Sequence, residues 1–165
     1  MDKKIKDVLY QAYVGESKAA LRLKVYADKA EQEEYLPIAK LFRVIARSEE
    51  IHGERCLRML KEIKSTEENL QASFESEVQV AGVAYEKFIK LATEAKDETA
   101  SSIFSQSRDV EDGHAKLYKE AMAHLMEERE TTYYVCKVCG YVSDGVLPDE
   151  CPVCGAKKEE FFKFE

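Results

Sequence analysis

Residues 49–52 read EEIH and residues 111–114 read EDGH, so a Glu-x-x-His motif occurs twice in this chain. Residues three apart lie on one face of a helix, which would place each glutamate beside its histidine. A single such motif is usually a solvated pair on a helix surface. A lone glutamate precedes each motif, however, and the three pairs of equivalent residues are 61, 62 and 62 positions apart. The repeat therefore favours one site built from two similar halves.

The repeated pattern predicts a metal centre inside a four-helix bundle. Di-iron carboxylate proteins direct a Glu from two helices and a Glu-x-x-His from the other two into the core of such a bundle. Because an unpaired buried carboxylate is very costly, four of them in one core need compensating cations. Two ferrous ions would balance their charge, and carboxylates with imidazole suit iron or manganese. The predicted ligands are Glu16, Glu49, His52, Glu77, Glu111 and His114.

Residues 1 to about 130 show the apolar spacing of amphipathic helices, with the proposed ligands on core-facing stripes. The helix boundaries have recognisable signals. Pro37 suits the first turn of the second helix, Ser65 to Glu68 reads as a capping box for the third, and Asp97 is a candidate N-cap for the fourth. We expect Cys56, one turn beyond the first histidine, to be a buried core thiol.

After Arg129 the helical pattern stops, and two C-x-x-C pairs follow, Cys136 with Cys139 and Cys151 with Cys154. A segment of about 35 residues cannot fold on apolar burial alone, so a bound metal must hold it together. Four thiolates bind either zinc or iron in a tetrahedral site, and the spacing alone leaves both open. We therefore predict a helical domain over residues 1–130 and a metal-stapled domain of strands and loops over residues 131–165.

Composition excludes several classes of function. The net charge of −7 is unfavourable for nucleic-acid binding, which needs a basic patch. No apolar run approaches the length of about 18 residues that a membrane span requires, and the N-terminal residues lack the apolar region of a signal peptide. Paired cysteines of this kind are typical of metal sites in intracellular proteins rather than disulfide frameworks. We expect a cytoplasmic protein.

A helical bundle followed by two cysteine knuckles resembles rubrerythrin over essentially the whole chain. The matching features include Gly15-Glu16-Ser17, both Glu-x-x-His motifs, Asn69-Leu70 ahead of the second lone glutamate, and the run CPVCGA at 151–156. The C-terminal part resembles rubredoxin, a one-electron module in which four cysteines bind one iron, through CxxCGY, CPxCGA and the flanking Tyr134 and Phe162. This resemblance favours iron over structural zinc.

The resemblance implies an all-α, ferritin-like four-helix bundle with a rubredoxin-like domain, two Fe in the bundle and one Fe in the four-cysteine site. It further implies a non-haem di-iron peroxidase that reduces hydrogen peroxide to water. The electrons would come from NAD(P)H through a reductase, or from rubredoxin, and pass through the rubredoxin-type iron. Tyr85 matches a tyrosine of the family's third helix, and we expect it to be catalytic together with the six bundle ligands.

The chain departs from the rubrerythrin pattern at two positions. Val80 stands where the family usually has a further glutamate, and Leu23 stands where the first helix usually has a tyrosine. Without the extra carboxylate, His52 should remain a ligand in both redox states. The same ligands also serve oxygen-reducing oxidases and ferroxidases, and a non-catalytic electron carrier or metal-stapled structural protein is a third reading.

The repeat also predicts a homodimer with exchanged helix pairs. A pseudo-twofold between the halves makes the second and third helices parallel, so joining them within one bundle needs a crossover as long as the bundle. From His52 to Glu77 there are only 25 residues, and most of them are needed to complete the two helices. A short turn near Lys64 can instead pass the third and fourth helices to a partner chain.

Overall fold

The computed structural model describes residues 1–124 and 131–164. The chain divides into two compact units, Met1–Lys64 and Ser65–Glu165. The domain boundary that we place near residue 130 falls among residues 125–130, which lie outside the described residues. Among the described helices, none combines the length and the apolarity needed to cross a lipid bilayer.

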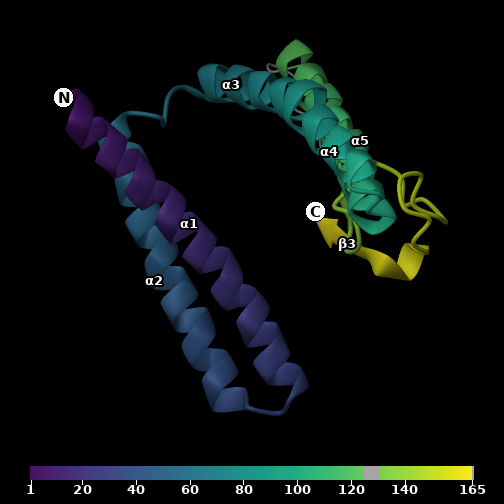
Figure 1. Ribbon diagram of the computed structural model, residues 1–165, viewed down its shortest axis with the longest axis horizontal. Coiled ribbons are helices and arrows are strands. Elements are labelled where there is room, and N and C mark those ends of the chain that lie inside the picture. Colours follow the sequence, from purple (N-terminus) through teal and green to yellow (C-terminus); the bar gives the residue numbers. More distant parts are fainter. Residues whose placement is uncertain (125–130, 165) are drawn as a thin grey trace. The chain divides into compact units, whose positions relative to one another are not determined.

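The first unit is a hairpin of two long helices, α1 (Lys3–Gln32) and α2 (Leu36–Leu60), which run side by side in Figure 1. The carboxylate of Asp2 begins α1 by accepting a hydrogen bond from the backbone N–H of Lys4 at 2.8 Å. A three-residue turn follows, in which Glu34 has a left-handed φ of 64°. Pro37 lies in the first turn of α2, which confirms the predicted start of that helix.

Small side chains form the seam between α1 and α2. Because alanine and glycine add little bulk, two helices lined with them can approach closely. The buried residues of α2 recur every seven positions, which keeps them on one side of the helix. The buried seam residues are Ala20, Ala27, Ala30, Ala39, Ala46, Gly53 and Leu60.

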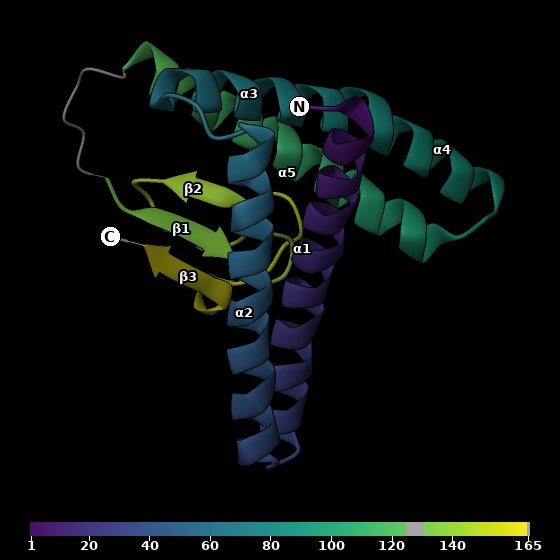
Figure 2. The same cartoon turned by 90° about the vertical axis from the view of Figure 1, so that its left-hand side faces the viewer.

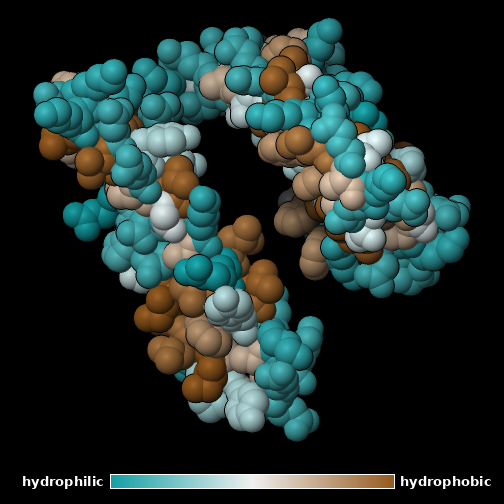
Figure 3. Space-filling view, viewed as in Figure 1, coloured by the Kyte–Doolittle hydropathy of each residue, from teal (hydrophilic) through white to brown (hydrophobic). Residues whose placement is uncertain are grey.

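The apolar residues that flank the ligands do not lie in this seam. We expected Ile38, Leu41 and Ile45 to face a bundle core, but within the described structure they are 40–52% exposed. A single helix pair buries one seam only, so its ligand-bearing stripe is left to be covered by further helices. Cys56 is half-buried, which corrects the prediction of a buried thiol. Figure 3 shows exposed apolar side chains on this pair, mainly in the half nearer its turn.

The second unit begins with another antiparallel helical pair. Its first arm is continuous and consists of α3 (Thr66–Gln79), a π-helical turn η1 (Val80–Tyr85) and α4 (Glu86–Glu94); the second arm is α5 (Glu98–Ala123). Figure 2 shows the two arms packed along each other. Ser65 forms the predicted capping box with Glu68, and Asp97 caps α5 by accepting a hydrogen bond from the N–H of Ala100 at 2.9 Å. The four predicted helical segments are thus confirmed, whereas η1 was not predicted.

The cysteine-rich region contains a small antiparallel sheet with the order β2-β1-β3. Its strands are β1 (Tyr133–Cys136), β2 (Val142–Asp144) and β3 (Phe161–Phe164), with a 3-10 turn, η2 (Lys158–Glu160), before β3. In the register, Tyr134 lies opposite Ser143 on one side and Lys163 on the other. Gly140 and Gly155 follow the second cysteine of each knuckle with φ of 82° and 75°, a conformation that glycine adopts without a steric penalty.

Candidate metal centres

The first Glu/His triad lies on the hairpin of α1 and α2. The Nδ1 atom of His52 lies 2.9 Å from Oε2 of Glu49 and 3.9 Å from Oε1 of Glu16. The two helices lie close together at this point. An added Cβ on Gly53 would lie only 3.9 Å from the Cβ of Glu16. The triad therefore combines two carboxylates and one imidazole from two neighbouring helices.

The second triad has the same geometry on α3 and α5. The Nδ1 atom of His114 lies 2.9 Å from Oε2 of Glu111 and 3.9 Å from Oε1 of Glu77. At metal–ligand bonds of about 2.1 Å, ligand atoms lie about 3.0 Å apart at right angles and about 4.2 Å apart when opposite. The distances in both triads fall close to or between these values. Each triad thus fits one transition-metal ion, with the histidine Nδ1 as the nitrogen ligand.

Each triad belongs to one compact unit, so the structure brings the six predicted bundle ligands together as two groups of three. The second triad is the less exposed, since the side chain of His114 is 27% exposed and that of His52 is 48% exposed. Burial raises the pKa of Glu77 above the ordinary carboxyl range, and a hydrogen bond and charge repulsion from Glu111 add to the rise. A cation in the triad would relieve this repulsion.

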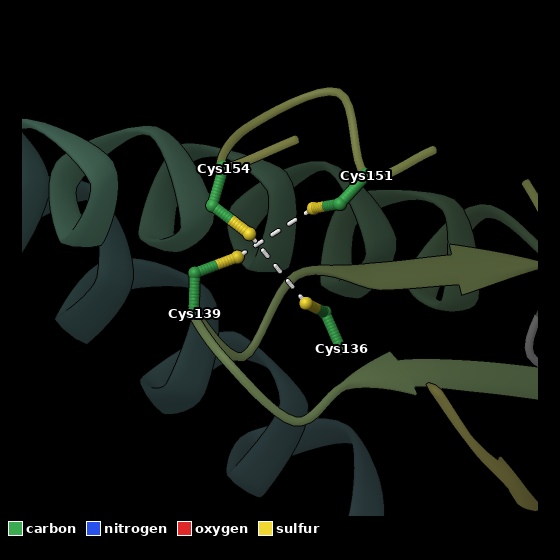
Figure 4. A group of neighbouring side chains, drawn as sticks. All are labelled: Cys136, Cys139, Cys151 and Cys154. Carbon is green, nitrogen blue, oxygen red and sulfur yellow. Dashed lines mark hydrogen bonds between the residues drawn. The ribbon is translucent and has the colours of Figure 1, made fainter. Parts of the chain in front are cut away.

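The four cysteine side chains converge on one point between the two knuckles (Figure 4). The Sγ atoms of Cys136 and Cys154 are 3.7 Å apart, and those of Cys139 and Cys151 are 3.6 Å apart. In a tetrahedral site with metal–sulfur bonds of about 2.3 Å, neighbouring sulfur atoms are about 3.8 Å apart. The sulfur positions therefore fit a single tetrahedral metal ion.

The thiols differ in their tendency to ionise. Burial raises the pKa of Cys139 and of Cys154, and hydrogen bonds with Cys136 and Cys151 add to both rises. Burial also opposes ionisation of Cys136, but hydrogen bonds from the backbone N–H groups of Cys139 and Val138 outweigh it and lower the pKa of that thiol. Four ionised thiolates this close together repel one another and need a cation between them. A bound metal ion supplies that charge and deprotonates its thiol ligands outright.

Tyr85 ends η1 and is half-buried against aromatic rings of α4 and α5. Its ring centroid lies 5.8 Å from that of Phe88 and 6.4 Å from that of Phe104. Val80, at the first position of η1, is also half-buried, and so is Leu23 in α1. Neither of these apolar side chains can bind a metal ion.

Two further observations concern the surroundings of the triads. Glu50 adjoins Glu49 but belongs to a surface network, in which it pairs with Lys24 and, at 2.8 Å, with Arg47. Those two partners lower its pKa, chiefly through the hydrogen bond from Lys24.

The π-helical turn η1, directly after the helix that carries Glu77, is the feature that sequence reasoning missed. Its only signal was the change in offset between the two halves from 61 to 62.

Comparison with known proteins gives matches over both parts of the chain. The family model described as Rubrerythrin matches residues 7–122. The family model described as Rubrerythrin, rubredoxin-like domain matches residues 134–162. The first match covers both triads, and the second covers all four cysteines.

Individual relatives match over nearly their full length. Rubrerythrin-2 of Clostridium acetobutylicum is 31% identical, over 96% of this chain and 95% of its own. A rubrerythrin of Porphyromonas gingivalis is 30% identical, over 93% of this chain and 86% of its own. Among solved structures, nigerythrin in a mixed-valence state matches with a TM-score of 0.60 and 25% identity, covering 96% of this chain and 86% of that one.

Proposed function

The chain belongs to the rubrerythrin family, and from that premise we propose that it is a non-haem di-iron peroxidase that reduces hydrogen peroxide to water. The observation that carries the proposal is the pair of Glu/His triads, in which the Nδ1-to-carboxylate distances are 2.9 and 3.9 Å in both copies. Family members are oxidoreductases, and the proposed reaction takes up two electrons and two protons for each peroxide and releases two water molecules.

The six triad residues are the proposed iron ligands, three for each ion. Their four carboxylates carry the charge that two ferrous ions neutralise, and their imidazoles add nitrogen ligands without adding charge. When bound, two ferrous ions supply both electrons that cleavage of one O–O bond requires. Three protein ligands for each ion leave room for a substrate, as in other metal sites that keep a position open.

Tyr85 is proposed to act directly on the substrate. Its phenol can donate a hydrogen bond to a peroxide oxygen and supply a proton as water forms. Val80 cannot substitute for the family's additional carboxylate, so the same six ligands would serve in every redox state. The site would then remain nearly symmetric, with His52 and His114 in equivalent roles.

The cysteine site is proposed to hold one iron that delivers electrons singly. Cys136, Cys139, Cys151 and Cys154 would be its ligands, in the manner of rubredoxin. Tetrahedral thiolate coordination suits an iron that exchanges one electron. The external donor would be an NAD(P)H-dependent reductase or a rubredoxin. Because metal-binding cysteine pairs are typical of reducing compartments, we place the reaction in the cytoplasm.

We further propose that the complete di-iron site forms between two chains. In the ferritin-like arrangement one connection between helices is a long crossover. Here α2 ends at Leu60 and α3 begins at Thr66. With His52 and Glu77 at the same level, the end of α2 and the start of α3 would lie about 28 Å apart along a bundle of parallel helices. The connecting residues reach about 21 Å when fully extended, so the third and fourth helices would join a partner chain.

The decisive experiment mixes the fully reduced protein with hydrogen peroxide and, separately, with O2 in a stopped-flow instrument. We expect peroxide to oxidise the di-iron site at least about ten times faster than O2 does, a difference of about 1.4 kcal/mol in activation free energy. A Cys139→Ser variant is the matched control, because it should keep the first turnover and lose repeated turnover with a reductase. A faster reaction with O2 would favour an oxidase or ferroxidase instead. No reaction with either oxidant would leave a non-catalytic electron carrier.

A further inference from the structure

The two helical pairs differ in length by one residue, and the difference lies in the arm that contains η1. From Glu16 to the last residue of α1, Gln32, there are 16 positions. From Glu77 to the last residue of α4, Glu94, there are 17. The second arm therefore has one residue more than its counterpart after the ligand glutamate.

The rest of each pair has the same length. A three-residue turn joins the arms in both, at 33–35 in the first and at 95–97 in the second. The next ligand glutamate then lies 13 positions after the first residue of its helix, Glu49 in α2 and Glu111 in α5. The additional residue accordingly lies between Glu77 and the end of α4.

Buried alanines narrow the position of the additional residue further. Ala20 and Ala81 are both buried and are 61 positions apart, whereas Ala30 and Ala92 are both buried and are 62 apart. The offset thus changes between Ala81 and Ala92, in the stretch that contains most of η1. A π-helical turn closes its hydrogen bond from i to i+5 instead of i to i+4, so it holds one residue more than an α-helical turn.

Aromatic pairs beyond the turn match at the larger offset. The rings of Tyr26 and Phe42 lie 5.9 Å apart in the first pair, and those of Phe88 and Phe104 lie 5.6 Å apart in the second. Both members of these pairs are 62 positions apart in the sequence. The two copies are therefore in register on both sides of η1.

By the same offset, Tyr85 occupies the place that Leu23 has in the first pair. Tyr85 is eight residues after Glu77, which in an uninterrupted α-helix would rotate it about 80° from the glutamate. If one residue is absorbed by the π turn, the eight steps act as seven, and the rotation falls to about 20°. Contact of the Tyr85 ring with Phe104, at 6.4 Å between centroids, agrees with this orientation.

We propose that η1 is a one-residue insertion whose π-helical turn positions Tyr85 on the ligand face of the second pair. Phe104 lies seven residues before Glu111, on the same face of α5. The two ligand triads keep the same geometry, but the ligand face of the second pair carries a phenol where that of the first carries a leucine. This assignment stands whichever substrate the site takes.

A pair of deletions tests the assignment. Deleting Gly82 removes the additional residue and leaves seven α-helical steps between Glu77 and Tyr85. The melting temperature should stay within about 2 °C of the parent protein. Arg22 is an exposed residue in the matching stretch of α1, which is α-helical throughout. Deleting Arg22 therefore shortens a helix that contains no π turn and no additional residue. It should rotate the alanine seam by about 100° and lower the melting temperature by about 5 °C or more.

Ring contacts measured by NMR provide a readout that stability alone would not change. The Gly82 deletion should keep nuclear Overhauser contacts between Tyr85 and Phe104. A Gly82→Ala variant keeps the residue count, and its Cβ would meet nothing within 4 Å, so it should retain the parent's contacts and ring chemical shifts. A Leu23→Tyr variant should create matching contacts with Phe42. The proposal is overturned if the Gly82 deletion loses the Tyr85 contacts or melts as low as the Arg22 deletion, or if the ring introduced by Leu23→Tyr fails to reach Phe42.

Discussion

His114 contacts Glu111 through its Nδ1 atom at 2.9 Å, the same atom and distance with which His52 contacts Glu49. The repeated geometry suits a metal ion bound through the Nδ1 atom of each imidazole. We expect Glu111→Ala and His114→Ala to abolish iron binding in the bundle and to leave the rubredoxin-type absorption spectrum unchanged, because the cysteines hold their iron independently. Absorption and iron analysis would measure both effects. Glu75→Ala, on the same helix as Glu77 but outside the triad, is the control, and simultaneous loss of both spectra would contradict the domain boundary near residue 130.

Iron content is the most direct test of the ligand sets. We expect two irons in the bundle and one in the cysteine site for each chain, since the chain supplies two triads and one group of four thiols. Metal analysis combined with Mössbauer spectroscopy would count and distinguish them. A colourless cysteine site that contains zinc would remove the proposed route for electrons.

Val80 predicts little movement of the irons between redox states. The family's additional carboxylate is absent at this position, so we expect no protein ligand to replace His52 when the iron is oxidised. Crystals of the oxidised and reduced protein should both show His52 bound. A Val80→Glu variant should restore the movement, and departure of His52 from the iron in the parent protein would disprove the explanation.

The raised pKa of Glu77 predicts a pH dependence in the metal-free protein. Because its folded-state pKa is raised, protonated Glu77 stabilises the fold at low pH, and that contribution is lost as the pH rises through the folded pKa. The side chain in a Glu77→Gln variant is neutral at every pH, so this variant should lose less stability than the parent protein as the pH rises. Urea midpoints between about pH 4 and 7 would show it. Glu75→Gln, whose parent carboxylate accepts a hydrogen bond from Gln71 at 2.7 Å, should leave the profile unchanged.

The exchange of helix pairs predicts a dimer in which each di-iron site takes ligands from both chains. Light scattering should find two chains in each particle. Mixing a Glu49→Ala chain with a Glu111→Ala chain should restore iron in half of the sites of each mixed dimer, because both lesions then fall in one site and the other is intact. A monomer that holds its full complement of di-iron would rule the exchange out.

Sequence reasoning identified the residues that carry chemistry because their spacing is dictated by helix geometry. Glu111 and His114 are three apart, and the cap at Ser65 uses a fixed side-chain pattern, so both could be recognised locally. The exposure of Ile38 and Ile45 in the helix pair could not be recognised, because it depends on which further helices cover the ligand face. The turn at Val80 has an ordinary apolar composition, and one additional residue in the offset was its sole trace.

Gly53 sets a limit on how the first triad can vary. It follows His52 directly, and an added Cβ would lie 3.8 Å from the ring of Tyr13 and 3.9 Å from the Cβ of Glu16, which is ordinary van der Waals contact. The equivalent residue of the second pair is Ala115, which is also buried. The seam therefore has room for a methyl group beside His52. A longer side chain at Gly53 would extend toward Tyr13 and Glu16, so we expect this small residue to set how closely the carboxylate of Glu16 approaches that of Glu49.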